Sequence, residues 1–175
     1  MAKVSICVPT YNNASEVERL LQSVHRQNYT DYEVNISDDS TNEETAELIE
    51  RISTEWSWQD KLHYIHNEKP LGHIYNWNAA IKMAAGQYIK IMFSDDWFTD
   101  EDSLGSFVNM LDEHPQADLA FSGSMQVLLD GQDIEQVKHL SKQATEHGNA
   151  YARCAEDSFI ERLHRNYKLF FLGNQ

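Results

Sequence analysis

Short apolar runs alternate with segments of helical periodicity up to about residue 121. The pattern begins with an apolar run at residues 3–8, after which Val17, Leu20, Leu21 and Val24 recur at the spacing of one helix face. Strands that alternate with helices in this way favour an α/β fold with a mostly parallel, Rossmann-like sheet and helices on both faces. The predicted strands are 3–8, 32–37, 62–65, 88–93 and 117–121, and the predicted helices are centred on 17–24, 48–52, 74–81 and 104–111.

Polar and glycine residues predict where these helices begin and end. Ser15 with Glu18, and Thr41 with Glu44, have the spacing of a capping box, in which each side chain satisfies a backbone N–H of the first turn. Gly86 is expected to end the third helix as its C-cap. The apolar face of that helix is predicted to carry Ile74, Trp77 and Ile81.

The pattern weakens after residue 121. Residues 124–129 are expected to extend the preceding strand or to pair with it, and residues 130–155 are polar enough to form a loop. A short helix is predicted around 159–163, and a last strand begins at 169–172. Because this strand begins as the chain ends, we expect a single domain over residues 1–175 that is truncated on its C-terminal side.

Composition excludes several classes of protein. A chain of 175 residues fits one domain, and a formal net charge of -14 disfavours binding to nucleic acid. Two distant cysteines, Cys7 and Cys154, make neither a disulfide framework nor a zinc site, which favours a reducing compartment. No apolar run approaches the roughly 20 residues of a transmembrane helix. We therefore expect a cytoplasmic protein, and a peripheral position at the cytoplasmic membrane face stays open.

Three polar clusters directly follow predicted strands. They are Pro9–Asn12, Asp38–Asp39 and Ser94–Asp96, and the carboxyl ends of parallel strands are where open α/β sheets bind ligands. Carboxylates alone repel a phosphorylated ligand, but Mg²⁺ or Mn²⁺ reverses that by binding protein carboxylates and ligand phosphates together. Neighbouring side chains on a strand point to opposite sides, so only one of Asp95 and Asp96 is expected to touch the metal.

Each cluster has an ordinary structural interpretation when it is taken alone. An Asp-Asp pair after a strand is most often a turn or a helix cap, and only the joint order of the three clusters favours a site. A receiver-type signalling domain also clusters acids on an α/β sheet, but its paired acids should follow the first strand, where this chain has Pro-Thr-Tyr. A non-catalytic nucleotide-binding or assembly module stays open.

The same clusters carry a resemblance to a known family. The chain resembles the N-terminal, nucleotide-sugar-binding part of family 2 glycosyltransferases, which have the GT-A fold. The matching segments cover roughly residues 3 to 125 in the order and spacing of the family. They are VSICVPTYNN, ISDDSTNEET, NEKPLGHIYNWNAAIKMAAGQYIKIMFSDDWF and ADLAFSGS.

The resemblance assigns a nucleotide-binding role to the first two clusters. Pro9, Thr10 and Tyr11 match the loop around the base, with the Tyr11 ring stacking on it. Asp39 matches an acid whose carboxylate accepts a hydrogen bond from uracil N3–H, which favours uracil over cytosine. The implied donor is therefore a UDP-sugar.

The resemblance also places the diphosphate and the metal. Gly72 and Asn78 match a glycine loop and helix that border the diphosphate or ribose, and Asp95 and Asp96 match the Asp-x-Asp-type (DXD) motif. Asp96 is the expected ligand of Mn²⁺ or Mg²⁺, with Asp95 nearer the ribose or sugar. Many members have Arg directly before the helix Asn, where this chain has Trp77. The metal is then expected to neutralise more of the diphosphate charge.

The resemblance implies inverting transfer of a sugar from the nucleotide diphosphate to an acceptor hydroxyl in polysaccharide or other glycan biosynthesis. The acceptor would be a glycan, a lipid-linked molecule or a protein. The catalytic base, a carboxylate in the family, is expected beyond Gln175, since Glu156–Asp157 is the one late acidic pair and matches poorly. The isolated chain is accordingly expected to bind the donor and to turn over poorly.

Overall fold

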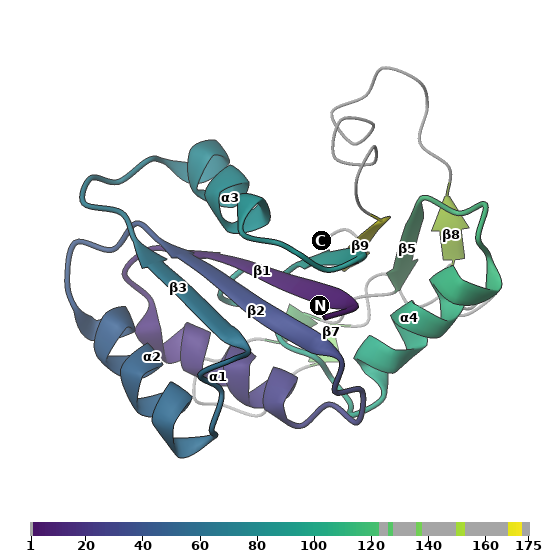
Figure 1. Cartoon of the computed structure of the whole chain (residues 1–175), viewed down its shortest axis with the longest axis horizontal. Coiled ribbons are helices and arrows are strands. Elements are labelled where there is room, and N and C mark those ends of the chain that lie inside the picture. The colour runs from purple at the N-terminus through teal and green to yellow at the C-terminus, as the bar shows by residue number, and fades with distance from the viewer. Residues whose placement is uncertain (1, 123–125, 128–135, 138–149, 153–167, 173–175) are drawn as a thin grey trace.

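The protein is built on one seven-stranded sheet, shown in the computed structural model of Figure 1. The structure describes residues 2–122, 126–127, 136–137, 150–152 and 168–172. The strands of the sheet are β1 (Val4–Thr10), β2 (Tyr32–Asp38), β3 (Leu62–His66), β4 (Tyr88–Ile91), β5 (Leu119–Ser122), β8 (Ala150–Ala152) and β9 (Lys168–Leu172).

The strand order confirms the predicted α/β class. It runs β3-β2-β1-β4-β9-β5-β8, and every pairing described within this sheet is parallel except that of β5 with β8. β1 and β2 lie inside the sheet and every one of their residues is buried, which explains the nearly continuous apolar run of β1. In β2 the buried residues include the polar Glu33, Asn35 and Ser37. The order reverses direction on either side of β1, where β2 and β4 flank it, and this arrangement opens a ligand site at the strand ends.

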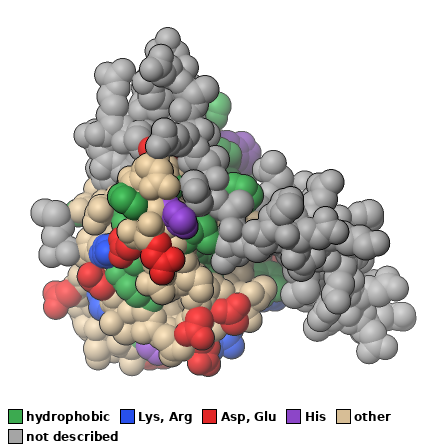
Figure 2. Space-filling view, turned by 90° about the vertical axis from the view of Figure 1, so that its right-hand side faces the viewer, with side chains coloured by type: hydrophobic (Ala, Val, Ile, Leu, Met, Phe, Trp, Pro, Cys, Tyr) green, Lys and Arg blue, Asp and Glu red, His purple; other side chains and the backbone are tan. Residues whose placement is uncertain are grey.

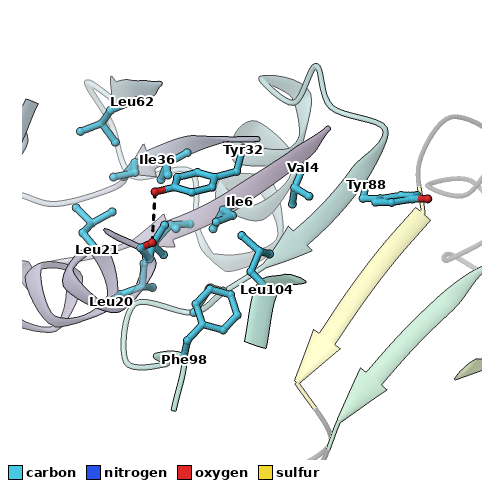
Figure 3. Packing of buried hydrophobic residues seen from close by; sticks show 14 of the residues in the cluster. Val4, Ile6, Leu20, Leu21, Tyr32, Ile36, Leu62, Tyr88, Phe98 and Leu104 are labelled. Atoms are coloured by element: carbon cyan, nitrogen blue, oxygen red, sulfur yellow. Dashed lines mark hydrogen bonds between the residues drawn. The ribbon is translucent and has the colours of Figure 1, made fainter. Parts of the chain in front are cut away.

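Helices cover both faces of the sheet unequally (Figure 1). The larger core joins three helices to one face of β1 and β2, and Figure 3 shows Ile6, Leu20 and Leu104 meeting there. A smaller core, with Cys7, Ala80 and Ile89, lies under one helix on the other face. The three helices on the first face are α1 (Ala14–His25), α2 (Glu44–Glu55) and α4 (Ser103–Glu113). The helix on the other face is α3 (His73–Lys82).

The predicted capping boxes do not form. α1 begins after Asn13 rather than at Ser15, and the N-cap of α2 is Glu43. In the second box Thr41 is used elsewhere, since its backbone N–H and its hydroxyl both donate to Asn12 Oδ1, at 2.9 and 3.3 Å. Thr41 and Asn12 therefore join two strand-end loops. In the first box the Ser15 hydroxyl donates to the neighbouring Glu16 carboxylate instead.

Gly86 does not end α3 as predicted. The C-cap is Met83, and Gly86 follows it in the connection to β4. The Gly86 N–H donates to Ser5 Oγ at 2.8 Å, and a Cβ at this position would lie 2.8 Å from that oxygen and 2.9 Å from the Val4 carbonyl carbon. The glycine is therefore explained by the close approach of two backbones.

The predicted apolar face of α3 is also partly wrong. Ile81 is buried, but Ile74 is 66% exposed and Trp77 is half-buried. Asn76 and Ala80 lie on the buried face instead. The helix is turned so that the Asn76 amide reaches the end of β1, and a polar contact outweighs the apolar pattern.

The last part of the chain differs most from the prediction. β6 (Gln126–Val127) pairs with β7 (Gln136–Val137) in a separate two-stranded sheet, not with β5. β7 and β8 both lie in the segment predicted as a loop. The strand predicted at 169–172 is confirmed as β9, which lies inside the sheet between β4 and β5. The helix predicted around 159–163 lies outside the described residues, as does Glu156–Asp157.

Figure 2 shows the charged side chains on one face of the molecule. Acidic side chains are spread over the described part of the face in Figure 2, with few Lys or Arg among them. Within the described ranges, no helix combines the length and the apolar character needed to cross a membrane.

Candidate functional site

The carboxyl ends of four parallel strands meet at one edge of the sheet. The register pairs Thr10 with Asp38 and Asp38 with His66, so β1, β2 and β3 end level with one another. The pairing of Cys7 with Ile91 puts the end of β4 beside them. The polar clusters predicted to converge therefore do lie along one edge.

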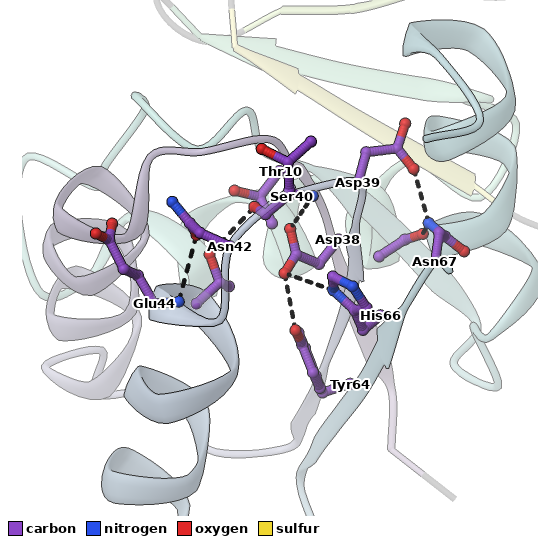
Figure 4. Close-up of polar contacts among 12 residues, drawn as sticks. Thr10, Asp38, Asp39, Ser40, Asn42, Glu44, Tyr64, His66 and Asn67 are labelled. Carbon is purple, nitrogen blue, oxygen red and sulfur yellow. Dashed lines mark hydrogen bonds and ion pairs between the residues drawn. The ribbon is translucent and has the colours of Figure 1, made fainter. Parts of the chain in front are cut away.

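Asp38 is a fully buried carboxylate that accepts several hydrogen bonds (Figure 4). Its Oδ1 accepts from the Ser40 N–H at 2.8 Å, and its Oδ2 accepts from the Tyr64 hydroxyl at 2.8 Å. His66 Nδ1 lies 3.5 Å from the same Oδ2. Burial and this carboxylate both raise the pKa of the Tyr64 hydroxyl, which therefore stays protonated as a donor. Asp38 thus stabilises the turn after β2.

Asp39 connects the turn after β2 to the segment before α3. It is 3% exposed; its Oδ1 accepts from Asn67 Nδ2 and its Oδ2 from the Gly72 N–H, both at 2.9 Å. Figure 4 shows the Asp39 side chain turned toward Asn67. Gly72 has φ +82, a region open mainly to glycine, and it sits at the N-cap of α3. Each carboxylate oxygen keeps a second lone pair for a ligand donor.

Thr10 is the centre of this edge. Its carbonyl oxygen accepts from the Asp39 N–H and from Asn76 Nδ2, both at 3.0 Å. Asn76 is buried, and the sequence pattern gave no reason to single it out. Asn78, which was predicted to border the diphosphate or ribose, is half-buried, and its side chain has no hydrogen-bond partner among the described residues. It remains available to a ligand.

A second set of hydrogen bonds joins the loop after β1 to the turn after β4. The Thr10 hydroxyl donates to Asn13 Oδ1, and Asn13 Nδ2 donates to Ser94 Oγ. Between them Tyr11 is 55% exposed, so its ring is free to stack on a planar ligand. Pro9 is buried within β1. The predicted base loop and the predicted metal motif are therefore held side by side.

The Asp95–Asp96 turn binds few protein donors. The Asp96 N–H donates to the Phe93 carbonyl at 2.9 Å, and the Phe93 N–H donates to Asp96 Oδ2 at 3.3 Å. Asp95 is exposed and Asp96 half-buried. Burial raises the pKa of Asp96, Asp95 adds to the rise, and the Phe93 N–H and the Lys90 ammonium oppose it. Since these two groups do not fully offset the burial of Asp96, a bound cation would stabilise its charged form.

The donor set fits a hard divalent cation. No group of three or more His, Cys, Asp or Glu that could hold a metal occurs in the part of the chain that the structure describes. Mg²⁺ keeps several waters and takes one or two protein carboxylates together with substrate phosphates, so Asp96 with Asp95 satisfies that requirement. The Asp-Asp turn could hold such an ion only as a partial site that a ligand completes.

Two aromatic contacts border the same turn. Trp77 of α3 packs on Phe93 with ring centroids 4.9 Å apart, which fastens the helix to the end of β4. Arg19 of α1 lies 5.2 Å from the centre of the Trp97 ring. Trp77, which stands where many family members have Arg, is thus a packing residue here.

A parallel sheet with an exposed aromatic ring, backbone donors and acidic side chains at its strand ends is typical of nucleotide-binding α/β domains. The sequence profile of Glycosyl transferase family 2 matches residues 5–164. The chain therefore belongs to glycosyltransferase family 2, as its motifs implied, and the receiver-domain alternative is wrong.

Curated relatives agree with this assignment. Abequosyltransferase RfbV of Salmonella typhimurium is 34% identical over 118 residues, which are 66% of this chain and 34% of that protein. The GalNAc(5)-diNAcBac-PP-undecaprenol beta-1,3-glucosyltransferase of Campylobacter jejuni is 27% identical over 97 residues, which are 55% of this chain and 30% of that protein. The chain thus spans about a third of the length of these relatives.

Solved structures give the fold. TarS 1–349 of S. aureus, in complex with UDP, has a TM-score of 0.61 and 28% identity over 77% of this chain and 38% of that one. The mannosyltransferase PcManGT from Pyrobaculum calidifontis, in complex with GDP-Man and Mn²⁺, has a TM-score of 0.62 and 25% identity over 71% of this chain and 36% of that one. The fold is GT-A, as predicted.

Proposed function

We propose that this chain binds a UDP-sugar and a divalent cation at the carboxyl edge of its sheet. In this proposal the chain supplies the donor half of a metal-dependent, inverting glycosyl transfer to an acceptor hydroxyl. The observation that carries the proposal is the hydrogen-bonded edge that joins Thr10, Asp39 and Ser94. That edge places an exposed ring, a held carboxylate and an acidic turn next to one another.

The uridine part of the donor has matching groups on β1 and β2. The Tyr11 ring is exposed enough to stack on the base, and Asp39 keeps lone pairs that could accept uracil N3–H. Pro9 and Thr10 would shape the base loop from within β1. TarS is described with UDP and with UDP-GlcNAc, which supports uridine as the base, whereas PcManGT is described with GDP-Man.

The diphosphate part faces the acidic turn and the start of α3. Asp96 would hold Mn²⁺ or Mg²⁺, Asp95 would lie nearer the ribose or sugar, and Gly72 and Asn78 would border the phosphates. When bound, the cation supplies Lewis acidity to the leaving diphosphate. The Mn²⁺ described with PcManGT supports this choice of ion.

We assign the acceptor half of the reaction to a part of the protein outside residues 1–175. Inversion needs a base that takes a proton from the acceptor hydroxyl on the face opposite the leaving group, and we place that base beyond Gln175. The acceptor is a glycan, a lipid-linked molecule or a protein. We place the protein in the cytoplasm.

A nucleotide panel tests the proposal. Thermal unfolding would be followed with UDP, GDP, CDP and dTDP, each with and without Mn²⁺. We expect UDP with Mn²⁺ to raise Tm most, and above all more than CDP, because uracil offers N3–H to Asp39 whereas cytosine has no hydrogen there. Thymine keeps N3–H, so dTDP differs from UDP only by its 5-methyl group and its deoxyribose. The shift should need the metal, because the metal offsets the acidic edge. Equal shifts for all four nucleotides, or a shift that does not need metal, would contradict the proposal. Binding of UDP by a full-length protein that never hydrolyses a UDP-sugar would favour a non-catalytic module.

A further inference from the structure

Asn13 is the N-cap residue of α1, but its side chain makes no capping hydrogen bond to the helix. Asn is favoured at this position because its side-chain oxygen can accept from a free N–H of the first turn. Here Oδ1 accepts from the Thr10 hydroxyl instead, and Nδ2 donates to Ser94 Oγ. The Asn13 side chain therefore joins the base loop to the turn after β4 and leaves its own helix without a side-chain cap.

The direction of these two hydrogen bonds follows from the burial of Thr10. Thr10 is 2% exposed, and among the described residues Asn13 Oδ1 is the one acceptor for its hydroxyl hydrogen. If the Asn13 amide were turned over, the Thr10 hydroxyl would accept from Nδ2, and its own buried hydrogen would have no acceptor. The amide nitrogen therefore faces Ser94, and the Ser94 oxygen is the acceptor in that pair.

The Ser94 hydroxyl consequently keeps an unused hydrogen. A hydroxyl is a donor as well as an acceptor, and the part of the chain that the structure describes offers this hydrogen no acceptor. Ser94 is 8% exposed, so bulk water reaches it poorly, and an unpaired donor there lowers stability. A bound molecule would supply the acceptor that the described chain lacks.

Ser94 lies between the parts of the edge proposed for the base and for the cation. On one side Asn13 joins it to the loop that carries Tyr11, and on the other side it directly precedes Asp95 and Asp96. In a nucleotide, the ribose lies between the base and the diphosphate. A ribose hydroxyl can accept from Ser94 and donate to the exposed Asp95 carboxylate, whereas a phosphate oxygen can only accept.

We propose that the Ser94 hydroxyl donates a hydrogen bond to a ribose hydroxyl oxygen of the bound nucleotide, and that Asn13 is the positioning residue that orients it. This inference rests on the proposed function of the same edge. It predicts that the chain distinguishes a ribonucleotide from a deoxyribonucleotide through the turn after β4. Asn13 acts through Ser94 and touches no part of the nucleotide.

Calorimetric titration of Ser94→Ala with UDP, 2′-deoxy-UDP and 3′-deoxy-UDP at saturating Mn²⁺ tests the inference. UDP should bind about fivefold more weakly than to the unchanged protein, because one hydrogen bond is lost. The affinity for one of the two deoxy analogues should stay the same, because that analogue already lacks the contacted oxygen. The analogue that is insensitive to the substitution identifies the hydroxyl. Ser106→Ala, at an exposed position of α4, is the matched control and should change no affinity.

Asn13→Asp tests the orientation of the Ser94 hydroxyl. The new carboxylate keeps the shape of the side chain and accepts from Thr10, but it cannot donate, so Ser94 has to give its hydrogen to it. The preference for UDP over the same analogue should therefore fall as in Ser94→Ala, while Tm is kept because Asp is an equally good N-cap. The ratio of two affinities removes the general effect of the added charge. A residue with only a structural role would lower Tm and weaken UDP and both analogues by the same factor.

The outcomes separate this inference from the proposed function. If the unchanged protein binds no UDP with Mn²⁺, the proposed function fails and the inference fails with it. If the unchanged protein binds UDP, but Ser94→Ala keeps the affinity for UDP or weakens UDP and both analogues equally, only the inference is overturned. Asn13→Asp decides by the same ratio should Ser94→Ala not fold.

Discussion

The chain carries two Asp-Asp pairs after two strands of one sheet, and they are in opposite physical states. Asp38 and Asp39 are buried and accept hydrogen bonds from backbone, hydroxyl and amide donors. Asp95 is exposed, and Asp96 is half-buried with a raised pKa because burial is poorly compensated. The same dipeptide at the same sheet edge has its hydrogen-bond partners in one place and lacks most of them in the other.

The difference lies in what surrounds each pair. β3 and the start of α3 bring Tyr64, Asn67 and Gly72 to the first pair. In the second pair, Asp96 accepts one hydrogen bond, from the Phe93 N–H of its own turn. The buried Lys90 lowers the pKa of Asp96 but does not cancel the rise that burial causes. A carboxylate that lacks protein partners is the better candidate for a metal, whereas a partnered one is the better candidate for fixing shape. Substitutions at Asp38 and at Asp96 should therefore separate stability from binding.

The largest expected effect is on folding, at the first pair. Asp38→Ala leaves the Ser40 N–H and the Tyr64 hydroxyl without an acceptor, so the free energy of unfolding should fall by about 3 kcal/mol. Asp95→Ala, the matched change at an exposed position, should stay within about 0.5 kcal/mol of the unchanged protein. Urea unfolding measures both. Equal losses at the two positions would mean that the contrast between the pairs is wrong.

The next effect is on binding, at the second pair. Asp96→Asn keeps the shape of the side chain but removes its charge, so the affinity for UDP with Mn²⁺ should fall on the order of a hundredfold. The free protein should keep its Tm, because burial already opposes the charged form of Asp96. Calorimetry and thermal unfolding give the two values. An Asp96→Asn protein that keeps its metal-dependent affinity would move the cation to other residues.

Gly72 tests the link between the first pair and α3. Its φ of +82 is unfavourable for any side chain, but a Cβ there would meet nothing within 4 Å. Gly72→Ala should therefore cost about 1.5 kcal/mol through backbone strain alone. Gly105→Ala in α4 is the control, since its Cβ would make ordinary contact with Tyr29 at 3.7 Å and alanine favours helix. A Gly72→Ala protein as stable as the unchanged one would show that this backbone conformation is not required.

The smallest effect on stability is expected at Glu33, a third carboxylate that accepts several hydrogen bonds. Glu33 Oε1 accepts from Ser5, Asn35 and the Ala85 N–H. Burial raises its pKa, but these hydrogen bonds and His63 outweigh burial, so the pKa is lowered. A lowered folded-state pKa means that the stabilisation is present above the ordinary Glu pKa and is lost as pH falls through the folded value. The stability difference between the unchanged protein and Glu33→Gln should therefore shrink below about pH 4.5.

Urea titrations of both proteins from pH 7 to pH 3 measure that difference. A gap that widens on acidification would contradict the direction of the Glu33 shift.

Much of the fold could be predicted because its signals are local. Buried parallel strands such as Val4–Thr10 read as continuous apolar runs, and amphipathic helices repeat their apolar residues at helical spacing. The convergence of Thr10, Asp39 and Ser94 followed from topology, since parallel strands end at one edge. The roles of individual residues at that edge remain predictions.

What the sequence did not reveal depends on contacts between distant segments. Asn76 faces inward because it reaches the Thr10 carbonyl, and Gly86 is small because it lies against Ser5, two pairs separated by 66 and 81 residues. Hydrophobic periodicity carries no information about such polar contacts. Lys90 is a single charge inside an apolar strand, and the sequence does not show that it is buried.

The central claim is that the carboxyl edge holds a uridine diphosphate through a cation on Asp96. A crystal structure of the chain with UDP and Mn²⁺ tests this most directly, because the anomalous signal of manganese locates the ion. We predict manganese about 2.1 Å from an Asp96 carboxylate oxygen and from phosphate oxygens, with uracil against Tyr11 and Asp39. Manganese and UDP bound away from this edge, or UDP bound there without the ion, would contradict the account.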